Sequence, residues 1–374
     1  MPPRLRNTVS TAVGREALDT DHPAGFRHRH AVRSIVMMAW MLLFLVVIGC
    51  AVDLDEVRTA EDGRVQLSVE RALMGTLFRI DVIVSDEVAG RRAIDAAFVE
   101  IERAEEILSN WSETSQISEL NRAAGIQPVV VSDELIAVLD RALDISRLTA
   151  GAFDITFASC GGLWSIRERR IPTETEIAAC LEHVDYRQVA LDLQQSAVFV
   201  ADRNTRVGIA GLAKGYRVDR AAHVLDTWGV MDYVVDGGGD MRVSSASKGD
   251  SWKIKVAHPR RPGEALGTVD LRSGAIATSG DYEWFFEVDG VRYHHILDPA
   301  TGRPARKCVS ATVIAENAVD ADALATGLFV MGPSEGLALA ERLPGVEALL
   351  IAPDLSVHTT SGFPNVVVLG AATS

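Results

Sequence analysis

The chain has 374 residues, of which 48% are hydrophobic and 24% are charged, a composition typical of globular proteins. Its formal net charge at pH 7 is −14. An acidic chain of this kind argues against nucleic-acid binding, because a basic surface supplies most of the affinity for nucleic acids. We therefore expect no nucleic-acid partner.

The N-terminal segment, residues 1–49, has the pattern of a bacterial signal peptide. A basic stretch precedes an uncharged apolar run of fifteen residues, 35–49, which is short for a spanning helix of about 20 residues but suits a signal-peptide core. Gly49 before Cys50 is typical of a lipoprotein cleavage site. We expect cleavage there and a lipid on Cys50, which anchors the chain in the cell envelope, on the outer side of the cytoplasmic membrane or in the periplasm. The alternative is an uncleaved signal anchor.

Cleavage would leave 31 basic and 48 acidic residues, a formal charge of −17. It would also leave Cys160, Cys180 and Cys308 besides Cys50, and their spacing fits no zinc site. One disulfide is possible in an oxidising compartment, but nothing in the sequence requires it. We interpret all three as small buried residues.

Hydrophobic periodicity predicts a polar tether over residues 50–66 and one α+β domain over residues 67–370. Strands are expected within 65–84, interrupted at 74–76, and near 188–200, 232–236, 252–257, 267–270, 311–315 and 347–352. Helices are expected over 91–108, from a Ser132 or Asp133 cap to about 149, and over 213–228, 320–331 and 334–343. Gly151, Gly229 and Gly332 are expected to end three of these helices.

Residues 207–216 combine small residues with a lysine. We expect Val207 and Gly208 to end a strand, residues 209–211 to form a turn, and Lys214 and Gly215 to lie in the first turn of a helix. Such a turn presents backbone N–H groups to an anion, and the lysine adds a positive charge. Close packing is the alternative explanation of the small residues.

Three further segments allow a ligand or a purely structural role. Residues 236–240 carry three glycines after a strand, which favours either close approach of a ligand or a hairpin turn. Residues 278–282 read as a turn whose hydroxyl groups reach a phosphate. Phe153 and Asp154 suit an aromatic heterocycle, or are a buried ring beside a helix-capping carboxylate.

Two polar clusters near the C-terminus indicate chemistry. His294 and His295 precede an Asp298-Pro299 turn, which places a titratable group on a constrained loop. Asp322 and Thr326 are four residues apart, so on a helix they share one face as two hard oxygen donors. A base and a hard-cation site close together predict metal-assisted chemistry on a phosphate.

The order of these segments resembles that of the ApbE family, the FAD:protein FMN transferases. The matching segments, spread over roughly residues 70–352, are Met74-Gly75-Thr76; Ser109-Asn110-Trp111 with Ile117-Ser118-Glu119-Leu120-Asn121; Gly151-Ala152-Phe153-Asp154; Gly211-Leu212-Ala213-Lys214-Gly215-Tyr216; Gly238-Gly239-Asp240; Thr278-Ser279-Gly280; His295-Ile296-Leu297-Asp298-Pro299 with Thr301-Gly302; and Asp322 with Thr326. The resemblance implies a single T-shaped α+β domain with mixed and antiparallel sheets flanked by helices.

The resemblance also implies an activity. Such a protein binds FAD and Mg²⁺ and transfers the FMN half of FAD to a threonine hydroxyl of an acceptor protein, with release of AMP. The acceptors would be FMN-carrying subunits of Na⁺-translocating NADH:quinone or Rnf-type complexes. A second hypothesis is a Mg²⁺-dependent FAD pyrophosphatase that gives FMN and AMP. A third is a non-catalytic exported lipoprotein that binds FAD.

The resemblance assigns the site residues by position. The Mg²⁺ ligands would be the backbone carbonyl of Gly211 and the side chains of Asp322 and Thr326. His295 would be needed for transfer; we assign it as the base that takes the threonine proton, with its ring oriented by Asp298 or by a backbone carbonyl. We interpret His294 as a surface or structural residue. The FAD site would be lined by Met74, Trp111, Ala152, Phe153, Asp154, Lys214 and Leu297.

Gly208 also belongs to the implied FAD site. Family members usually carry an acidic residue there that contacts the flavin nucleotide, and a glycine cannot replace it. We expect a weaker FAD site, another acid, or water at this position. Trp111 stands where tyrosine is common, and both side chains offer a flat face for stacking.

Overall fold

The structure is a computed structural model that describes residues 54–59, 63–73, 75–109, 112–246, 251–364 and 367–368. These residues belong to one compact unit, Asp53–Ser374. The predicted signal peptide, Cys50 and the predicted site residues Met74 and Trp111 lie outside the described residues. Within the described ranges, no helix is long and apolar enough to cross a membrane.

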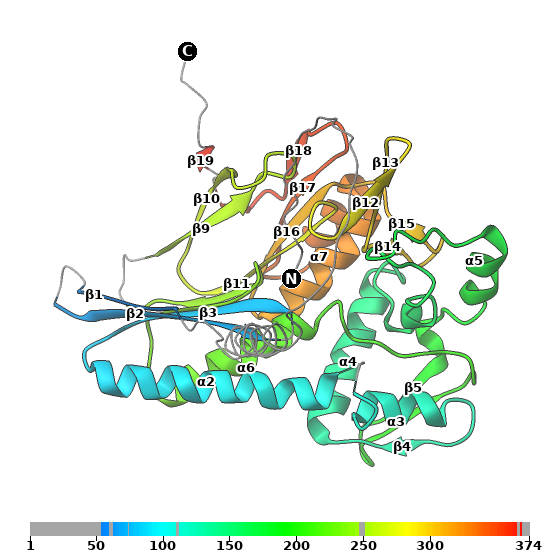
Figure 1. The fold of residues 1–374 in the computed structure, drawn as a ribbon, viewed down its shortest axis with the longest axis horizontal. Coiled ribbons are helices and arrows are strands. Elements are labelled where there is room, and N and C mark those ends of the chain that lie inside the picture. The colour runs from blue at the N-terminus through cyan, green and yellow to red at the C-terminus, as the bar shows by residue number, and fades with distance from the viewer. Residues whose placement is uncertain are drawn as a thin grey trace, which may run out of the picture. The chain divides into compact units, whose positions relative to one another are not determined.

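A large antiparallel sheet organises the fold (Figure 1). Within the described residues it has nine strands, and every neighbouring pair is antiparallel. In spatial order they are β1 (Leu54–Thr59), β2 (Val65–Leu73), β3 (Thr76–Val84), β7 (Tyr233–Gly237), β8 (Met241–Ser244), β11 (Gly274–Gly280), β16 (Ser310–Ala315), β17 (Glu347–Ile351) and β18 (Val357–Thr359).

Smaller sheets surround this one. Two of them have three strands each in the described chain, and two are hairpins. They are formed by β4 (Val129–Val130), β6 (Ala197–Val200) and β5 (Val189–Asp192); by β19 (Val367–Val368), β10 (Ala265–Leu271) and β9 (Trp252–Ala257); by β12 (Phe285–Val288) and β13 (Val291–His294); and by β14 (Leu297–Asp298) and β15 (Arg303–Pro304).

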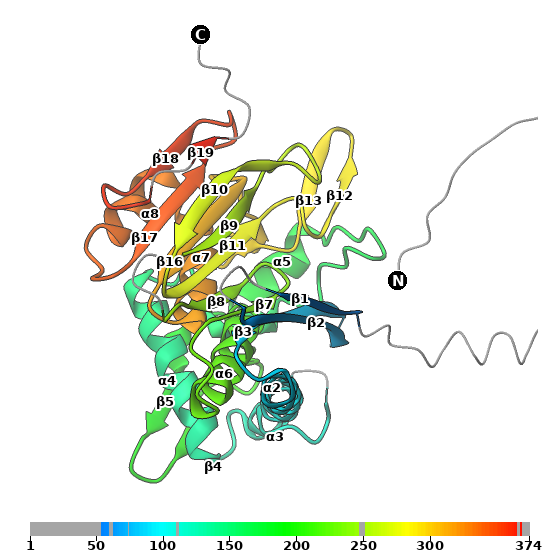
Figure 2. The same cartoon turned by 90° about the vertical axis from the view of Figure 1, so that its left-hand side faces the viewer.

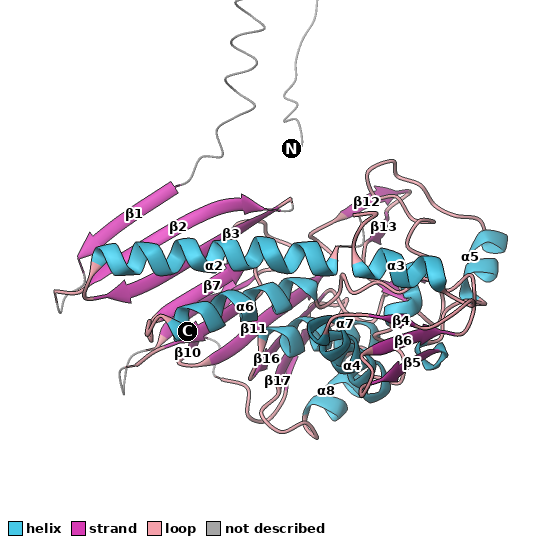
Figure 3. Ribbon diagram, turned by 90° about the horizontal axis from the view of Figure 1, so that it is seen from below, coloured by secondary structure: helices cyan, strands magenta, loops and turns pink. Residues whose placement is uncertain are grey.

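Helices cover one face of the large sheet (Figure 3). They are α2 (Glu87–Leu108), which packs on β2 and β3; α6 (Ala213–Thr227), on β7 and β8; α7 (Ala318–Met331), on β11 and β16; and α8 (Pro333–Ala340), on β17. The remaining described helices are α3 (Gln116–Ala123), α4 (Asp133–Leu148), α5 (Glu174–Leu181) and the 3₁₀ helices Ile155–Ser159 and Tyr186–Gln188.

On the opposite face of the large sheet, β9 and β10 cover β7, β8, β11 and β16 (Figure 2). Side chains alternate between the two faces along each strand, as the pleat requires. Val235 and Ala277 pack in the helix-side core, whereas their neighbours Val234 and Ile276 pack against the β9–β10 side. A strand buried on both faces reads as a continuous apolar run, which is how β7 and β16 were predicted.

The predicted helices are present, although α2 begins at Glu87 rather than at 91 and α8 ends at Ala340 rather than at 343. The apolar face expected for α2 packs on the core: Ile94, Ala97, Phe98, Ile101 and Ala104 are buried, and Ile107 is partly buried. Of the two candidate caps of α4, the side chain of Ser132 accepts the bond, from the backbone N–H of Leu135. Glycines with positive φ follow α4, α6 and α7, at Gly151, Gly229 and Gly332.

Several local predictions are wrong. Residues 54–59 of the predicted tether form edge strand β1, whose exposed faces leave no hydrophobic alternation to detect. Thr278–Gly280 do not form a turn but end β11, paired with β16. Val207 and Gly208 form no strand, because they bond instead to the Asn121 side chain and to the carbonyl of Ile155. Helices α3 and α5 were not predicted.

The interpretation of the cysteines is also wrong in part. Cys160 and Cys180 form a disulfide that joins the residue after the first 3₁₀ helix to α5. Cys308 is a free buried thiol, as expected. The sequence could not decide between these roles, since twenty residues separate the bonded pair and only folding brings α5 back.

Candidate active site

The N-terminus of α6 and the middle of α7 meet closely. The backbone N–H of Gly215 donates to Oδ2 of Asp322 at 3.0 Å. A Cβ atom at Gly215 would lie 2.1 Å from the carbonyl oxygen of Ala318, so this contact requires glycine. Close packing, the alternative explanation for the small residues, is therefore correct at Gly215, and the same contact brings Lys214 beside Asp322.

The glycine-rich segment 236–240 is a hairpin turn between β7 and β8, and it also contributes a charge. Gly238 and Gly239 have φ of 77° and 101°, a backbone conformation that favours glycine. A Cβ at Gly238 would lie 2.5 Å from Cγ2 of Thr76, so the turn rests against the start of β3. Asp240, buried at the end of this turn, forms an ion pair with Lys214.

Asp240 was not among the predicted site residues, although its segment was. The signal that could have identified Asp240 is its position directly after the glycines of the hairpin turn, which faces the helix that carries Lys214. The pairing itself is tertiary, because 26 residues separate Lys214 from Asp240.

Three charges dominate the electrostatics of the site. Burial raises the pKa of Asp322, and the nearby Asp240 raises it further, while Lys214 acts in the opposite sense. Burial likewise raises the pKa of Asp240, with Lys214 opposing. Burial would lower the pKa of Lys214, but the two carboxylates reverse this and hold it above its usual value. Two buried carboxyl groups thus lie beside one ammonium group, with Arg217 also acting on Asp322, and a bound cation would favour the ionised form of both acids.

The predicted metal ligands lie together. Asp322 and Thr326 occupy one face of α7, and Thr326 is the less buried of the two. A Cβ at Gly211 would lie 3.8 Å from Oγ1 of Thr326, and the Ser279 hydroxyl is 3.3 Å from the same oxygen. A carboxylate, a hydroxyl and a backbone carbonyl are the hard oxygen donors that Mg²⁺ prefers.

These donors fit a divalent cation because they are hard oxygens beside two buried carboxyl groups, whose ionised forms a bound cation would favour. Among the described residues, no cluster of three or more His, Cys, Asp or Glu side chains forms a metal site. The predicted ligands are not such a cluster, because only Asp322 contributes a carboxylate. Gly211 would contribute a backbone carbonyl oxygen and Thr326 a hydroxyl oxygen. Mg²⁺ binding itself stays a prediction.

The turn at Gly211 packs on an aromatic ring. A Cβ at Gly211 would lie 2.9 Å from Cε2 of Phe153, which is buried. The neighbouring Asp154 caps the first 3₁₀ helix through the backbone N–H of Thr156 at 2.7 Å, and accepts the N–H of Tyr186 at 3.0 Å. The structural alternative for Phe153 and Asp154 is thus realised, and their contact with FAD stays a prediction, as it does for half-buried Ala152, Gly208 and Leu297.

The two histidines have different environments. His294 is buried; its Nε2 donates to the carbonyl oxygen of Ala305 at 2.8 Å, and its Nδ1 accepts the N–H of Ile296. Burial lowers its pKa, so it is a neutral structural residue, as one of the two interpretations held. His295 is exposed and follows strand β13.

The ring of His295 is oriented by a backbone carbonyl. Its Nδ1 lies 3.4 Å from the carbonyl oxygen of Trp284, which can only accept, so Nδ1 carries the proton and Nε2 presents a lone pair. Of the two predicted orienting groups this is the carbonyl; the Asp298 carboxylate instead accepts the N–H of Ala300 at 2.9 Å. Lys214 contributes to lowering the pKa of His295, which places the ring within the field of the lysine.

Desolvation by the surrounding chain is the main cause that lowers the pKa of His295, to about 4. One side of the residue is open to water, and hydration there weakens this effect. In either case the ring is neutral at pH 7. A neutral imidazole with a free Nε2 is competent to accept a proton.

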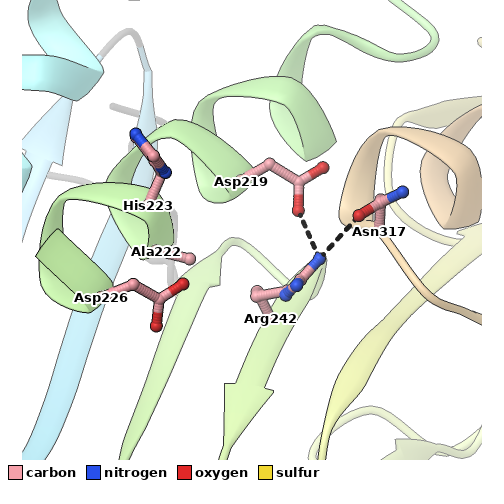
Figure 4. Close-up of a pocket in the computed structure, with 6 residues that line it drawn as sticks. All are labelled: Asp219, Ala222, His223, Asp226, Arg242 and Asn317. Carbon is pink, nitrogen blue, oxygen red and sulfur yellow. Dashed lines mark hydrogen bonds and ion pairs between the residues drawn. The ribbon is translucent and has the colours of Figure 1, made fainter. Parts of the chain in front are cut away.

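A pocket near the other side of α6 is a separate feature (Figure 4). Its polar groups bind one another: Arg242 donates to Asp219 at 3.2 Å and to Asn317 at 3.0 Å. Asp219 also accepts the N–H groups of Ala318 and Val319, which begin α7. We interpret this pocket as the structural junction of α6, β8 and α7, since none of the predicted site residues lines it.

Fold and site together define a class of protein: an α+β domain in which a glycine turn, a half-buried lysine beside two buried carboxyl groups, and an oriented histidine occur together. The model of the ApbE family matches residues 74–350. The chain belongs to the ApbE family, and this membership makes it a transferase.

The chain is similar along most of its length to proteins named FAD:protein FMN transferase. The chain is 34% identical to an FAD:protein FMN transferase of Treponema pallidum over 86% of its own length and 94% of that protein. It is 32% identical to one from Vibrio cholerae, over 74% of this chain and 84% of that protein. Both names were expected from the order of the sequence segments.

Solved structures share the fold. The ApbE protein of Thermotoga maritima has a TM-score of 0.72 and 34% identity, over 79% of this chain and 97% of that one. The flavin transferase ApbE of Vibrio cholerae has a TM-score of 0.70 and 30% identity, over 80% of this chain and 98% of that one. The predicted α+β class with antiparallel sheets flanked by helices is confirmed.

Proposed function

We propose that this chain transfers the FMN half of FAD to a threonine hydroxyl of an acceptor protein, with Mg²⁺ required and AMP released. The observation that carries the proposal is Lys214, which pairs with Asp240, lies beside Asp322 and acts electrostatically on His295. The names of the relatives support the flavin substrate and the protein acceptor.

The first task of the site is to bind a diphosphate. Lys214 offers positive charge in the first turn of α6, and the dipole of the helix adds to it. The N–H groups of Ala213 and Gly215 already donate to Ile209 and Asp322, so the lysine is the main charged contact for the diphosphate. Oxygen donors from Gly211, Asp322 and Thr326 would hold Mg²⁺, which when bound supplies charge neutralisation on the diphosphate oxygens. The ion pair with Asp240 keeps the Lys214 ammonium fixed at this position.

The second task is to activate the acceptor hydroxyl. The threonine oxygen forms a bond to the phosphorus of the FMN half, and the bond from that phosphorus to the AMP oxygen breaks with its electron pair on AMP. The hydroxyl proton passes to Nε2 of His295, which is free because Nδ1 faces the Trp284 carbonyl. Such general-base help contributes about 10²–10⁴-fold to the rate.

The position of Gly208 distinguishes this chain. Its N–H donates to the carbonyl of Ile155 at 2.8 Å, which holds the segment without any side chain. This bond brings Gly208 beside the neighbour of Ile155, the half-buried Asp154, whose carboxylate is already bonded to Thr156 and Tyr186. We propose that FAD binds here without an acidic side chain at position 208.

FAD hydrolysis to FMN and AMP is the second candidate. The same residues would serve it, with water in place of the threonine. The non-catalytic binder is less well supported, because binding alone requires no neutral, carbonyl-oriented histidine.

We further propose that the chain is exported and anchored by a lipid on Cys50, and that its acceptors are subunits of Na⁺-translocating NADH:quinone or Rnf-type complexes. The Cys160–Cys180 disulfide supports export, because disulfides persist mainly in oxidising compartments.

One experiment tests the activity. The mature protein is incubated with FAD, Mg²⁺ and the FMN-carrying subunit of a Na⁺-translocating NADH:quinone complex, and the products are separated on a denaturing gel viewed under ultraviolet light. We expect a fluorescent acceptor band, retained by a His223→Ala control at an exposed histidine on α6 and lost in His295→Ala, which still binds FAD. AMP release without a labelled acceptor would favour the hydrolase, and a normally active His295→Ala would remove His295 from the mechanism.

A further inference from the structure

Trp284 lies directly across from His295. The register of the β12–β13 hairpin pairs Phe286 with Tyr293 and Phe285 with His294. The next pair outward is Trp284 with His295, joined by the backbone N–H of His295, which donates to the carbonyl oxygen of Trp284 at 3.1 Å. Opposite residues of an antiparallel pair project on the same face, with Cβ atoms about 4.5–5.5 Å apart.

The face that carries this pair is aromatic. Phe286 and Tyr293 stack at 5.3 Å between ring centroids, and Trp164 stacks on Tyr293 at 5.9 Å. Phe286 is buried, whereas the Trp284 side chain is 65% exposed. Phe285 of the same hairpin is 38% exposed, but the guanidinium of Arg292 lies over its ring. The Trp284 indole is therefore the larger and more exposed of the two rings, and it lies beside the proposed base.

We propose that the Trp284 indole is a docking contact for the acceptor polypeptide and helps to determine which acceptors are used. This inference rests on the proposed function, in which an acceptor hydroxyl must approach Nε2 of His295. A chain in extended conformation advances about 3.3–3.6 Å per residue, so residues one or two positions from the reacting threonine pass over the indole. The favoured partner is an extended segment with small or apolar side chains next to its threonine.

The acceptor suits this position better than the flavin does. Of the predicted FAD-lining residues, Phe153 and Lys214 gather at the Gly211 turn and the start of α6, whereas Leu297 follows His295 by two positions and is half-buried. Trp284 belongs to neither segment and faces water. Exposed tryptophans that become covered are frequent anchors of protein–protein contacts.

The test is a Trp284→Ala variant. It keeps the backbone carbonyl that orients His295, so the base remains in place while the indole is removed. The probes are the FMN-carrying subunit of a Na⁺-translocating NADH:quinone complex and a synthetic peptide of its flavinylated segment. We expect the KM for both probes to rise about tenfold or more, with kcat at saturating acceptor and the Kd for FAD unchanged.

Two further variants sharpen the comparison. Trp284→Phe keeps an aromatic face and should restore most of the lost acceptor affinity. Trp228→Ala removes a tryptophan that is 50% exposed at the end of α6. It should leave the acceptor KM, kcat and the Kd for FAD unchanged.

The outcomes are distinct. An unchanged acceptor KM in Trp284→Ala overturns the inference. A weaker Kd for FAD with unchanged acceptor KM also overturns it and assigns the indole to the flavin, and a fall in kcat alone makes Trp284 a positioning residue for His295 instead. If the unmodified chain labels neither probe, the proposed function itself fails.

Discussion

Lys214, Asp240 and Asp322 form the electrostatic centre of the proposed site. Each carboxylate is buried, and burial raises the pKa of both, while Lys214 opposes this for both and Arg217 opposes it for Asp322. Buried carboxyl groups with shifted pKa values cost stability, and proteins retain them where a ligand favours the ionised form. The residue-level design thus favours binding of a cation together with a diphosphate.

Asp322→Asn tests this balance. The buried Asp322 carboxyl has a raised pKa, so its ionised form opposes folding as pH rises above its usual range. The variant should therefore be as stable as the original chain, or more stable, in the absence of metal at pH 8, but should lose the Mg²⁺-dependent rise in Tm. That rise corresponds to about 2.7 kcal/mol when the ion is at 100 times its Kd.

The measurement is thermal unfolding with and without Mg²⁺ in the presence of FAD. Asp320→Asn serves as the control, because Asp320 lies on the same helix and pairs with Arg141 instead. An Asp322→Asn protein that Mg²⁺ still stabilises normally would contradict the assignment.

The environment of His295 predicts how the rate of transfer depends on pH. Its pKa is lowered to about 4, and a histidine acts as a base only above its pKa, where it is unprotonated. At saturating Mg²⁺, kcat/KM for the acceptor should show no loss attributable to this group between pH 8 and pH 6. Measurements of kcat/KM across this range would detect the alternative, a decrease with an apparent pKa of about 6.5, the value of an unperturbed histidine.

The helix α6 brings the site together at the level of elements. Its first turn carries Lys214 and Gly215, and its N-terminus approaches α7 so closely that no side chain fits between the helices. α7 is buried on almost every side, so its position is fixed by β11 and β16 as well as by α6. Asp322 and Thr326 are therefore held by packing rather than by a loop.

Gly215→Ala should disrupt this contact. The added Cβ would lie 2.1 Å from the Ala318 carbonyl oxygen, a backbone atom that cannot rotate away. We expect a loss of at least about 2 kcal/mol in the free energy of unfolding, within the range for overpacked cores. Chemical denaturation measures it, with Gly162→Ala as the control, since a Cβ there meets nothing within 4 Å.

The disulfide links two further elements. Cys160 follows the first 3₁₀ helix, which Asp154 caps, and Cys180 lies in α5. Closing a loop of about 20 residues contributes roughly 3 kcal/mol in the chain-entropy treatment. A reducing agent should lower the Tm of the original chain and leave a Cys160→Ser/Cys180→Ser variant unaffected; equal Tm values with and without reductant would contradict the bond.

At the scale of the whole molecule, the large sheet separates two packed layers. Helices cover one face, and β9 and β10 cover the other face over β7, β8, β11 and β16. The ends of β7 and β11 and the starts of α6 and β3 meet at one place, which is where the glycine turns allow close approach. The site is thus built from segments spread along the chain, on rigid elements.

Attachment of the molecule to a membrane is testable in cells. Cys50→Ser should abolish lipidation and shift the protein from the detergent phase to the aqueous phase in a detergent-partition assay. Transfer by the purified domain should be unchanged. Continued detergent partitioning of Cys50→Ser would instead favour the uncleaved signal anchor.

The sequence by itself determined the local elements. Periodicity and end signals predicted helices over 213–228 and 320–331, which the structure has as Ala213–Thr227 and Ala318–Met331, and the spacing of Asp322 and Thr326 placed both on one helix face. The order of short segments along the chain identified the family. Each segment can be recognised without the fold, because turns and helix caps are formed by residues that are close together in the sequence. Edge strand β1 was missed, since an exposed strand leaves no apolar alternation.

The tertiary structure decided which distant residues meet. Lys214 and Asp240 are 26 residues apart, and Gly215 and Asp322 are 107 apart. The Cys160–Cys180 bond and the pairing of Trp284 with His295 arise in the same way. Local patterns specify helices and strands, whereas the contacts between them follow from packing whole faces together, and that information is not contained in any single segment.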